Sequence, residues 1–305
     1  MIKTLRIIPD GTHVNFFAMR FMAFALSAIM FVGSIGFMMT KGLHLGIDFT
    51  GGTLVEVRLD EAPDMSGLRS KFANLPYGNI SLQEFGEPEE LLIRIPEQPG
   101  GVDEQMVAVE GVRNVLNELH GEEAVEYRRT EFVGPQVGGE LIKAGIYAVL
   151  FSLGGILIYV SFRFEWQFGL AAVIALIHDA VITVGFFAVT GLEFNLATVA
   201  AVLTIAGYSI NDTVVVFDRV RENLRKFKKM NFADLLNLSV NQMLARTLLT
   251  SFTTLLALIA LYWFGGEVLR GFISALIFGV VVGTYSSTFV AGTFLNYIGL
   301  RKINA

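Results

Sequence analysis

The sequence predicts an α-helical polytopic membrane protein with six transmembrane helices and one external α+β domain. The chain of 305 residues is 53% hydrophobic and only 17% charged, whereas a typical soluble domain has about 25% charged residues. Six apolar stretches have roughly the 20 residues that a helix needs to cross a bilayer. These stretches are Met19–Met39, Leu141–Phe162, Phe168–Thr190, Leu196–Phe217, Arg246–Phe264 and Gly271–Tyr297.

The first apolar stretch is expected to remain in the protein as a membrane anchor. It is longer than the roughly 7–15 residues of a signal-peptide core, and no clear small-residue cleavage site follows it. The chain then divides into a cytoplasmic N-terminal segment, a first transmembrane helix, an external domain and a block of five transmembrane helices. The respective ranges are 1–18, 19–39, 40–138 and 139–305.

The distribution of Lys and Arg predicts the orientation of the spans. The loop 218–245 is strongly basic, whereas Arg270 is the only basic residue in the short connections 191–195 and 265–270. Because basic loops remain in the cytoplasm, this loop and both termini are expected there, and residues 40–138 on the outer side. The basic residues of the two terminal segments are Lys3, Arg6, Arg301 and Lys302.

The external domain has the element pattern of a ferredoxin-like sandwich. Alternating apolar residues indicate strands, and apolar residues at helical spacing indicate helices. The resulting order, β-α-β-β-α-β, is that of a split βαβ fold. The domain has 8 basic and 18 acidic residues, which we interpret as a solvated surface. The predicted elements span 53–59, 65–75, 80–85, 91–97, 103–121 and 124–134.

Several classes of chemistry have no residues to support them. The chain has no cysteine, and its four histidines form no metal-spaced pair. The glycine-rich segment 46–52 lacks the Lys-Ser/Thr and the helix of a phosphate loop, so it indicates a tight turn. No catalytic triad, nucleotide fingerprint or metal signature occurs elsewhere. We therefore expect no enzymatic activity, no cofactor, no metal and no nucleic-acid partner.

Two charged residues lie where spanning helices normally exclude them. Asp212 lies in the fourth apolar stretch and Arg246 opens the fifth. A charged side chain near the bilayer centre costs about 2.5–3.5 kcal/mol on insertion scales. Residues 232–244 predict an amphipathic helix on the cytoplasmic membrane surface that runs into the fifth span, so Arg246 lies inside one long helix. The pair predicts a proton relay, and a structural ion pair between two helices is an equal alternative.

Further polar residues in the spans are secondary candidates. Histidine titrates near neutral pH, and hydroxyl groups can relay protons through water or bond to neighbouring helices. For the threonines alone, helix packing is the favoured interpretation. Small residues at helix-packing spacing, such as Gly279 and Gly283, predict close contact between helices. The secondary candidates are His178, Asp179, Asn211, Thr250 and Thr254.

Five motifs stand out along the chain. They are GIDFTGG at 46–52, VGPQVGGEL at 133–141, FRFEW at 162–166, HD at 178–179 and GYSINDTVVVFDRVREN at 207–223. Together they resemble the SecD/SecF family of protein-export membrane proteins, within the RND superfamily, and most closely its SecF members. The resemblance covers essentially the whole chain. It includes a set of structural motif residues: Gly46, Asp48, Gly51, Gly52, Gly134 and Pro135.

The resemblance implies a half-RND membrane fold in the bacterial inner membrane and an obligate partner, SecD. It implies that the protein uses the proton-motive force to promote preprotein translocation with the SecYEG channel, with YajC as a further candidate partner. It also implies that Asp212 is required for proton flow and that Arg246 is its partner. Two alternatives remain open at this point, a proton-coupled exporter of small molecules and a scaffold of the export channel without motor activity.

Overall fold

The computed structural model describes residues 14–298, which form two compact units. The membrane unit comprises the residues up to His44, Ala148–Leu192 and the residues from Ala197 onward. The outer unit comprises Leu45–Tyr147 and the short segment Glu193–Leu196. The basic residues of both terminal tails, on which the orientation was partly based, lie outside the described residues.

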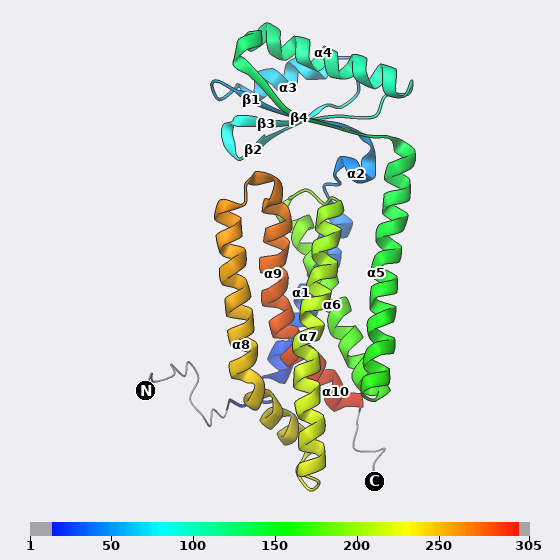
Figure 1. Ribbon diagram of the computed structural model, residues 1–305, viewed down its shortest axis with the longest axis vertical. Coiled ribbons are helices and arrows are strands. Elements are labelled where there is room, and N and C mark those ends of the chain that lie inside the picture. The colour runs from blue at the N-terminus through cyan, green and yellow to red at the C-terminus, as the bar shows by residue number, and fades with distance from the viewer. Residues whose placement is uncertain (1–13, 299–305) are drawn as a thin grey trace. The chain divides into compact units, whose positions relative to one another are not determined.

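Six helices of the described chain are long and apolar enough to cross a membrane, and they match the six predicted spans (Figure 1). The last span is not one continuous α-helix, because α9 and α10 are joined by a π-helical segment. The helices are α1 (Arg20–Thr40), α5 (Pro135–Arg163), α6 (Trp166–Thr190), α7 (Leu196–Lys226), α8 (Phe232–Phe264), α9 (Arg270–Ser286), the π segment (Ser287–Ala291) and α10 (Gly292–Ile298).

The start of α8 differs from its prediction as a helix lying on the membrane surface. Its apolar residues Phe232, Leu235 and Leu236 are buried in a cluster with Phe217 and Val220 of α7. The apolar face therefore packs against protein rather than being free for lipid. The prediction that this segment continues directly into the fifth span is confirmed, since α8 is unbroken from Phe232 to Phe264.

Glycine brings α9 close to α7 in the membrane unit. A Cβ atom placed on Gly279 would overlap the side chain of Ile205, and one on Gly283 would lie 3.1 Å from Ser209 Cβ. The two glycines are one turn apart on the same face of α9, as their spacing predicts. Close approach of these two helices is what allows short serine side chains of α9 to reach polar groups of its neighbours.

We expect Gly279→Ala to destabilise the membrane unit by about 1–3 kcal/mol, because an added methyl group overpacks a tight contact. Gly207→Ala is the matched control, since a Cβ there would meet nothing within 4 Å. The thermal unfolding of both purified variants in detergent measures the difference. Equal unfolding temperatures would contradict the close packing described for α9.

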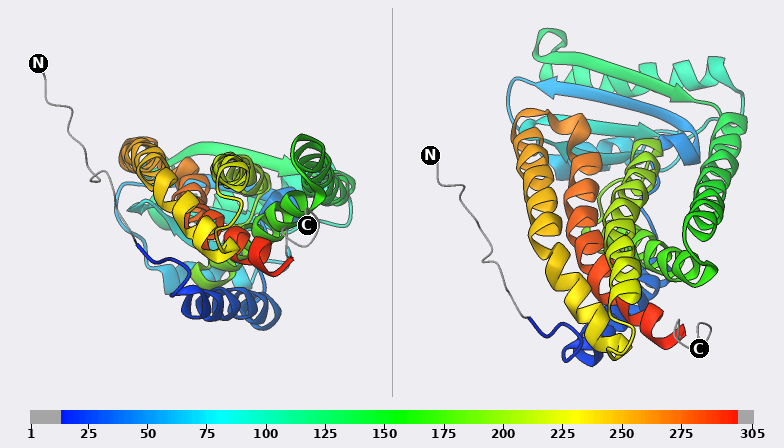
Figure 2. Two further views of the ribbon diagram at one scale, coloured as in Figure 1. Left: turned by 90° about the horizontal axis from the view of Figure 1, so that it is seen from below. Right: turned by 60° about the horizontal axis from the view of Figure 1, so that its bottom comes forward.

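The outer unit contains one four-stranded sheet with the strand order β2-β3-β1-β4, in which all neighbouring strands are antiparallel. The helices α3 and α4 cover one face of it (Figures 1 and 2). This order and pairing confirm the predicted ferredoxin-like fold. The elements are β1 (Gly52–Leu59), α3 (Met65–Ala73), β2 (Ser81–Phe85), β3 (Glu87–Ile95), α4 (Val102–His120) and β4 (Val125–Val133).

The core of the outer unit lies between this sheet and its two helices. Phe72 of α3, Val112 and Leu116 of α4 and Val55 and Val57 of β1 are all fully buried in one cluster. Alternation places the apolar side chains of a strand on one face, and helical spacing does the same for α4. The unit therefore has a core of its own that needs no lipid.

We expect the fragment 40–138 to fold alone, with a cooperative unfolding transition in urea. In this fragment Leu116→Ala should cost about 2–5 kcal/mol, because it leaves a cavity in the core. Leu119→Ala is the matched control on the same helix, since Leu119 is 42% exposed. A fragment without a cooperative transition, or equal effects of the two substitutions, would refute an independently folding domain.

Candidate functional site

Asp212 lies in the seventeenth position of α7 and is partly buried inside the helix bundle. Both of its carboxylate oxygens accept hydrogen bonds from hydroxyl groups of neighbouring helices. Thr247 of α8 donates to Oδ1 at 2.7 Å, and Ser287 of the π segment donates to Oδ2 at 2.6 Å. The carboxylate is thus held by two neutral donors, each of which can reverse its role and accept from a protonated acid.

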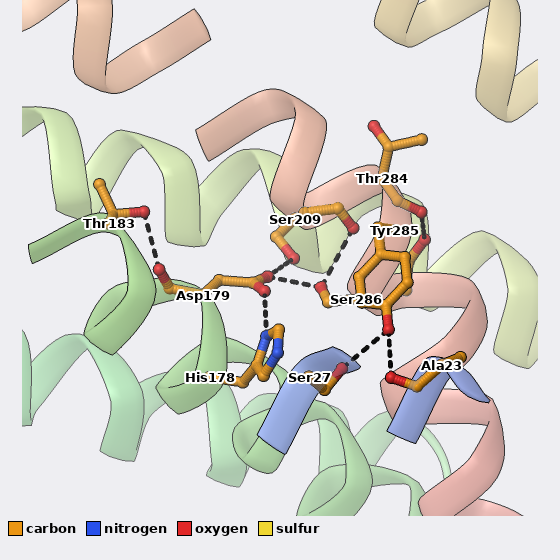
Figure 3. Close-up of polar contacts among 11 residues, drawn as sticks. Ala23, Ser27, His178, Asp179, Thr183, Ser209, Thr284, Tyr285 and Ser286 are labelled. Carbon is orange, nitrogen blue, oxygen red and sulfur yellow. Dashed lines mark hydrogen bonds and ion pairs between the residues drawn. The ribbon is translucent and has the colours of Figure 1, made fainter. Parts of the chain in front are cut away.

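Asp179 of α6 forms a second, more deeply buried carboxylate site, with 1% of the residue exposed. Its Oδ2 accepts hydrogen bonds of 2.6 Å from Ser209 of α7 and from Ser286 of α9. Its Oδ1 lies 3.0 Å from Nδ1 of His178 (Figure 3). Three helices therefore place polar groups around a single carboxylate, and the side chains of His178 and Asp179 contact each other although the two residues are adjacent on α6.

Two consecutive serines connect the carboxylates of Asp179 and Asp212. Ser286, the last residue of α9, bonds to Asp179, and Ser287, the first residue of the π segment, bonds to Asp212. Consecutive residues of an α-helix diverge by about 100°, so the pair can contact two different helices. π-helical turns are rare in proteins, and those that occur often lie at functional sites. This supports a functional assignment of this part of the bundle.

Arg246 does not contact Asp212 in this structure. Arg246 is exposed, and no hydrogen bond or ion pair between the two side chains exists in residues 14–298. The position facing Asp212 is occupied by the next residue, Thr247. Arg246 does lie in the interior of the long helix α8, as expected. The expected pairing thus requires an arrangement of α7 and α8 other than the one described here.

The remaining secondary candidates lie away from the two carboxylates. The hydroxyls of Thr250 and Thr254 donate to backbone carbonyls of their own helix, at Arg246 and Thr250 respectively. Such bonds are ordinary for threonine in an apolar helix and agree with the packing interpretation. Asn211 is exposed. These three residues are therefore not brought together with Asp212 or Asp179.

The sequence analysis did not identify Thr247, Ser286 and Ser287 as site residues. Single hydroxyl residues in apolar helices are common and carry no chemistry by themselves. The available signal was the sequence Thr-Tyr-Ser-Ser at 284–287, a run of hydroxyl-bearing residues inside the sixth apolar stretch. A second polar chain was also missed, in which Ser251 bonds to both Tyr208 and Thr284.

The glycine-rich segment 46–52 holds the loop between α6 and α7 within the outer unit. Gly46 donates its backbone N–H to the carbonyl of Phe194 at 2.9 Å. Oδ2 of Asp48 accepts a 2.8 Å bond from the N–H of Leu196, the first residue of α7. A side-chain acceptor there satisfies an N–H that has no partner within the helix. Asp48 thus caps the helix that carries Asp212.

The predicted tight turn in this segment is a single helical turn, α2 (Ile47–Thr50), followed by two glycines. Gly51 and Gly52 have φ angles of 72° and 109°, which favour glycine over other residues. A side chain on Gly52 would also overlap the backbone carbonyl of Ile95. At the other end of the outer unit Gly134 precedes α5, which starts at Pro135, a favourable first position for proline.

Glu193, also in the loop between α6 and α7, forms an ion pair with Arg94 of β3. Burial raises the pKa of Glu193, while the charge of Arg94 and its hydrogen bond oppose this effect. Because the pKa is raised in the folded state, the protonated form of Glu193 stabilises the fold more than the ionised form does. This contribution is present below the unfolded-state pKa of about 4.3 and is lost as the pH rises through the folded-state pKa. At neutral pH the stability therefore depends on Arg94.

We expect Arg94→Gln to lower the unfolding temperature of the full chain more at about pH 7 than at about pH 4.5, because only ionised Glu193 needs the cation. Arg129→Gln is the control, since its pair with Glu131 is exposed and such pairs contribute about 0–1 kcal/mol. Thermal unfolding in detergent at the two pH values measures both. A loss that is independent of pH would show that Glu193 does not ionise in the folded protein.

The fold and the site together define a class of protein. Six membrane-spanning helices with carboxylates inside the bundle, and an external ferredoxin-like domain after the first span, form a multi-pass membrane protein of half-RND type. A family model described as the C-terminal region of the protein export membrane proteins SecD/SecF matches residues 112–301. A second, described as the SecD/SecF GG motif, matches residues 36–63. The chain belongs to the SecD/SecF family.

Relatives and solved structures agree with this assignment. The protein translocase subunits SecF of Rickettsia felis and Rickettsia prowazekii are 44% and 43% identical to the chain over 305 residues, covering 99% of it and 97% and 96% of their own lengths. The crystal structure of SecDF, a translocon-associated membrane protein from Thermus thermophilus, superposes with a TM-score of 0.85 at 37% identity. SecDF in a super-membrane-facing form superposes with a TM-score of 0.70 at 36% identity.

The two SecDF structures are longer than this protein. The superposition covers 95% and 98% of the present chain but only 39% and 40% of the respective SecDF chains. This chain therefore corresponds to less than half of the SecDF polypeptide. Activities and partners of a complete SecDF assembly accordingly belong to the proposals that follow.

Proposed function

We propose that this chain is the SecF-type subunit of a SecDF complex and uses the proton-motive force to promote preprotein translocation with the SecYEG channel. The observation that carries the proposal is the position of Asp212 inside the helix bundle, where the hydroxyls of Thr247 and Ser287 are its side-chain partners among residues 14–298. A carboxyl group in a membrane interior is costly. Its presence is therefore best explained by a function that requires it to gain and lose charge.

The proton step follows from the chemistry of Asp212 and Arg246. In the arrangement described here both carboxyl oxygens of Asp212 are bonded to neutral hydroxyls, which can also accept a hydrogen bond from a protonated acid. A rotation of α8 by about 100° would replace Thr247 with Arg246, and the cation would stabilise the carboxylate and release the proton. One proton crossing 100 mV supplies about 2.3 kcal/mol, which is enough to bias a conformational equilibrium severalfold.

The proposed setting is the bacterial inner membrane, with both termini and the basic loop 218–245 in the cytoplasm and the domain 40–138 outside. SecD is the proposed obligate partner and YajC a further candidate. The chain covers less than half of the SecDF chain that it matches. This supports a partner that supplies the remaining part. An 18-residue apolar window of α5 has no residue that is buried within the chain, which leaves the surface of that window for lipid or for partner helices. No enzymatic activity and no cofactor are proposed.

The test compares preprotein export into membrane vesicles that contain SecYEG and SecD, with and without this chain. The expected result is a stimulation of export that disappears when an ionophore collapses the proton gradient. Stimulation that survives the ionophore would favour the scaffold function instead. Loss of a small molecule's gradient-driven efflux on deletion of the chain, with unchanged export, would favour the exporter function.

A further inference from the structure

The two ring nitrogens of His178 have very different surroundings. Nδ1 lies 3.0 Å from Oδ1 of Asp179, whereas Nε2 is buried and has no hydrogen-bond partner among the described residues. The residue as a whole is 6% exposed. A neighbouring carboxylate fixes the proton of a neutral imidazole on the nitrogen that faces it. Nε2 is then a bare acceptor, and an unpaired buried acceptor costs about 1–3 kcal/mol.

The ring of His178 borders a pocket of about 310 Å³ between α1, α6 and the end of the sixth span. Ser27 of α1 is the other polar side chain that lines it, and aromatic side chains form much of the remaining wall. The pocket is therefore mainly apolar, with the ring of His178 and the hydroxyl of Ser27 as the polar groups in its wall. The aromatic residues of the wall are Phe24, Phe31, Phe289 and Phe294.

The charge of the buried pair favours the uptake of one proton. With a neutral ring, His178 and Asp179 together carry one negative charge, balanced only by the hydroxyls of Ser209 and Ser286. No Lys or Arg side chain in residues 14–298 hydrogen-bonds or ion-pairs with either residue. A proton bound at Nε2 forms one N–H bond, breaks none within the pair, and leaves an imidazolium beside a carboxylate with no net charge.

The packed neighbours of the pair contain two other titratable groups. The ring of Tyr285 on α9 lies 6.4 Å from the ring of His178, and its hydroxyl is bonded to Ser27 and to the carbonyl of Ala23 (Figure 3). Asp212 on α7 is connected through the consecutive serines 286 and 287. Tyr285 is already satisfied, so Asp212 is the group whose charge matters most to the pair.

We propose that His178 and Asp179 form a second proton-binding site, coupled to Asp212 through Ser286 and Ser287. The part of this inference that concerns transport rests on the proposed function, whereas proton binding by the pair does not. Ser286 and Ser287 are positioning residues, because each acts through the carboxylate that it bonds. Any movement of α9 that breaks one of these hydrogen bonds disturbs the other, so the two sites change their protonation together.

The direct test is nitrogen NMR of the full-length chain in lipid bilayers with isotopically labelled histidine. Only four histidines contribute signals, and His178→Gln identifies the one of interest. We expect His178 to show one protonated and one bare nitrogen at alkaline pH and two protonated nitrogens on acidification, within about pH 5–8. A His178 ring that keeps one bare nitrogen throughout this range would overturn the proposal.

Variants separate the site from its surroundings. Asp179→Asn should abolish the doubly protonated signal and reduce gradient-driven export about tenfold or more. Ser286→Ala should alter the pH response of the His178 signal, whereas Thr183→Val, which removes a buried hydroxyl bonded only to the backbone of Asp179, should not. A signal that is unchanged in Asp179→Asn, or changed equally by the two hydroxyl variants, would overturn the coupling.

The same measurements distinguish failure of this inference from failure of the proposed function. In Asp212→Asn the pair should still take up its proton, but at a changed pH because the coupled charge has been removed, so the doubly protonated His178 signal should persist while gradient-driven export is lost. Normal export in Asp212→Asn together with a titrating His178 would refute the proposed function and leave the second site standing. Lost export together with a His178 ring that never becomes doubly protonated would refute the second site alone.

Discussion

Asp212→Asn should insert and assemble normally and yet lose all proton-dependent stimulation of export. The amide has nearly the shape of the carboxyl group and keeps one oxygen acceptor for Thr247. Its NH₂ group can donate to Ser287, whose hydroxyl then accepts and still donates to the carbonyl of Thr284. Every polar group remains satisfied, so the packing should survive. An amide cannot ionise at any accessible pH, so the proton step should not.

The measurement combines the protein level in membranes, co-purification with SecD and export in vesicles with an imposed gradient. Asn211→Asp/Asp212→Asn is a useful companion variant, because it restores a carboxyl group one position away on the exposed Asn211 face. It should not restore function, since that face does not contact Thr247 or Ser287. Export that remains sensitive to the gradient in Asp212→Asn would eliminate the relay.

Replacing Arg246 should have the second largest effect, although Arg246 touches neither carboxylate in this structure. Arg246→Ala should abolish gradient-driven export, because Asp212 would have no cation to keep it ionised in any arrangement. Arg246→Lys should impair export less, since the charge remains but the planar fork and its fixed geometry are lost. Protein levels should stay nearly normal in both, because the exposed side chain contributes little to packing.

A double-mutant cycle decides whether Arg246 acts through Asp212. Once Asp212 is Asn, Arg246→Ala should cost little further activity, and independent additive losses would mean separate functions. Thr247→Val is the neighbouring control, because it removes only the hydroxyl that bonds Asp212 in this arrangement. It should reduce the rate modestly, by the loss of a hydrogen bond worth about 1 kcal/mol. An effect of Thr247→Val as large as that of Arg246→Ala would contradict the proposed exchange.

The six spans and the outer domain could be predicted because each rests on a local pattern. Apolar length identified every span, and alternation identified every strand of the sheet. The ends of these elements were harder to predict than their existence. The helix α7 continues to Lys226, well beyond the predicted end of the span at Phe217. Residues 218–226 are polar on one side and pack Val220 and Leu224 on the other. A hydropathy pattern ends where the bilayer does, whereas a helix continues while its face is covered.

The site was predictable only in part. A charged residue in an apolar stretch is rare, so Asp212, Arg246 and Asp179 were identified. Hydroxyl residues in such stretches are common, and Ser286 and Ser287 gain their significance from lying against two carboxylates that are more than 70 positions away in sequence. The choice between Arg246 and Thr247 at Asp212 depends on the rotation of α8. Sequence spacing does not determine that rotation.

The π segment that begins at Ser287 has a consequence for the phase of the last span. A uniform α-helix has a single angular register along its length, so its two ends cannot be aimed independently. Widening one turn from Ser287 to Ala291 shifts the register of everything that follows by roughly one residue's rotation, about 100°. The part before the wide turn, α9, can keep its glycines against α7 while α10, after it, presents a different side to α6. If that wide turn moved along the helix, the same residues would face new neighbours without any change in the length of the span.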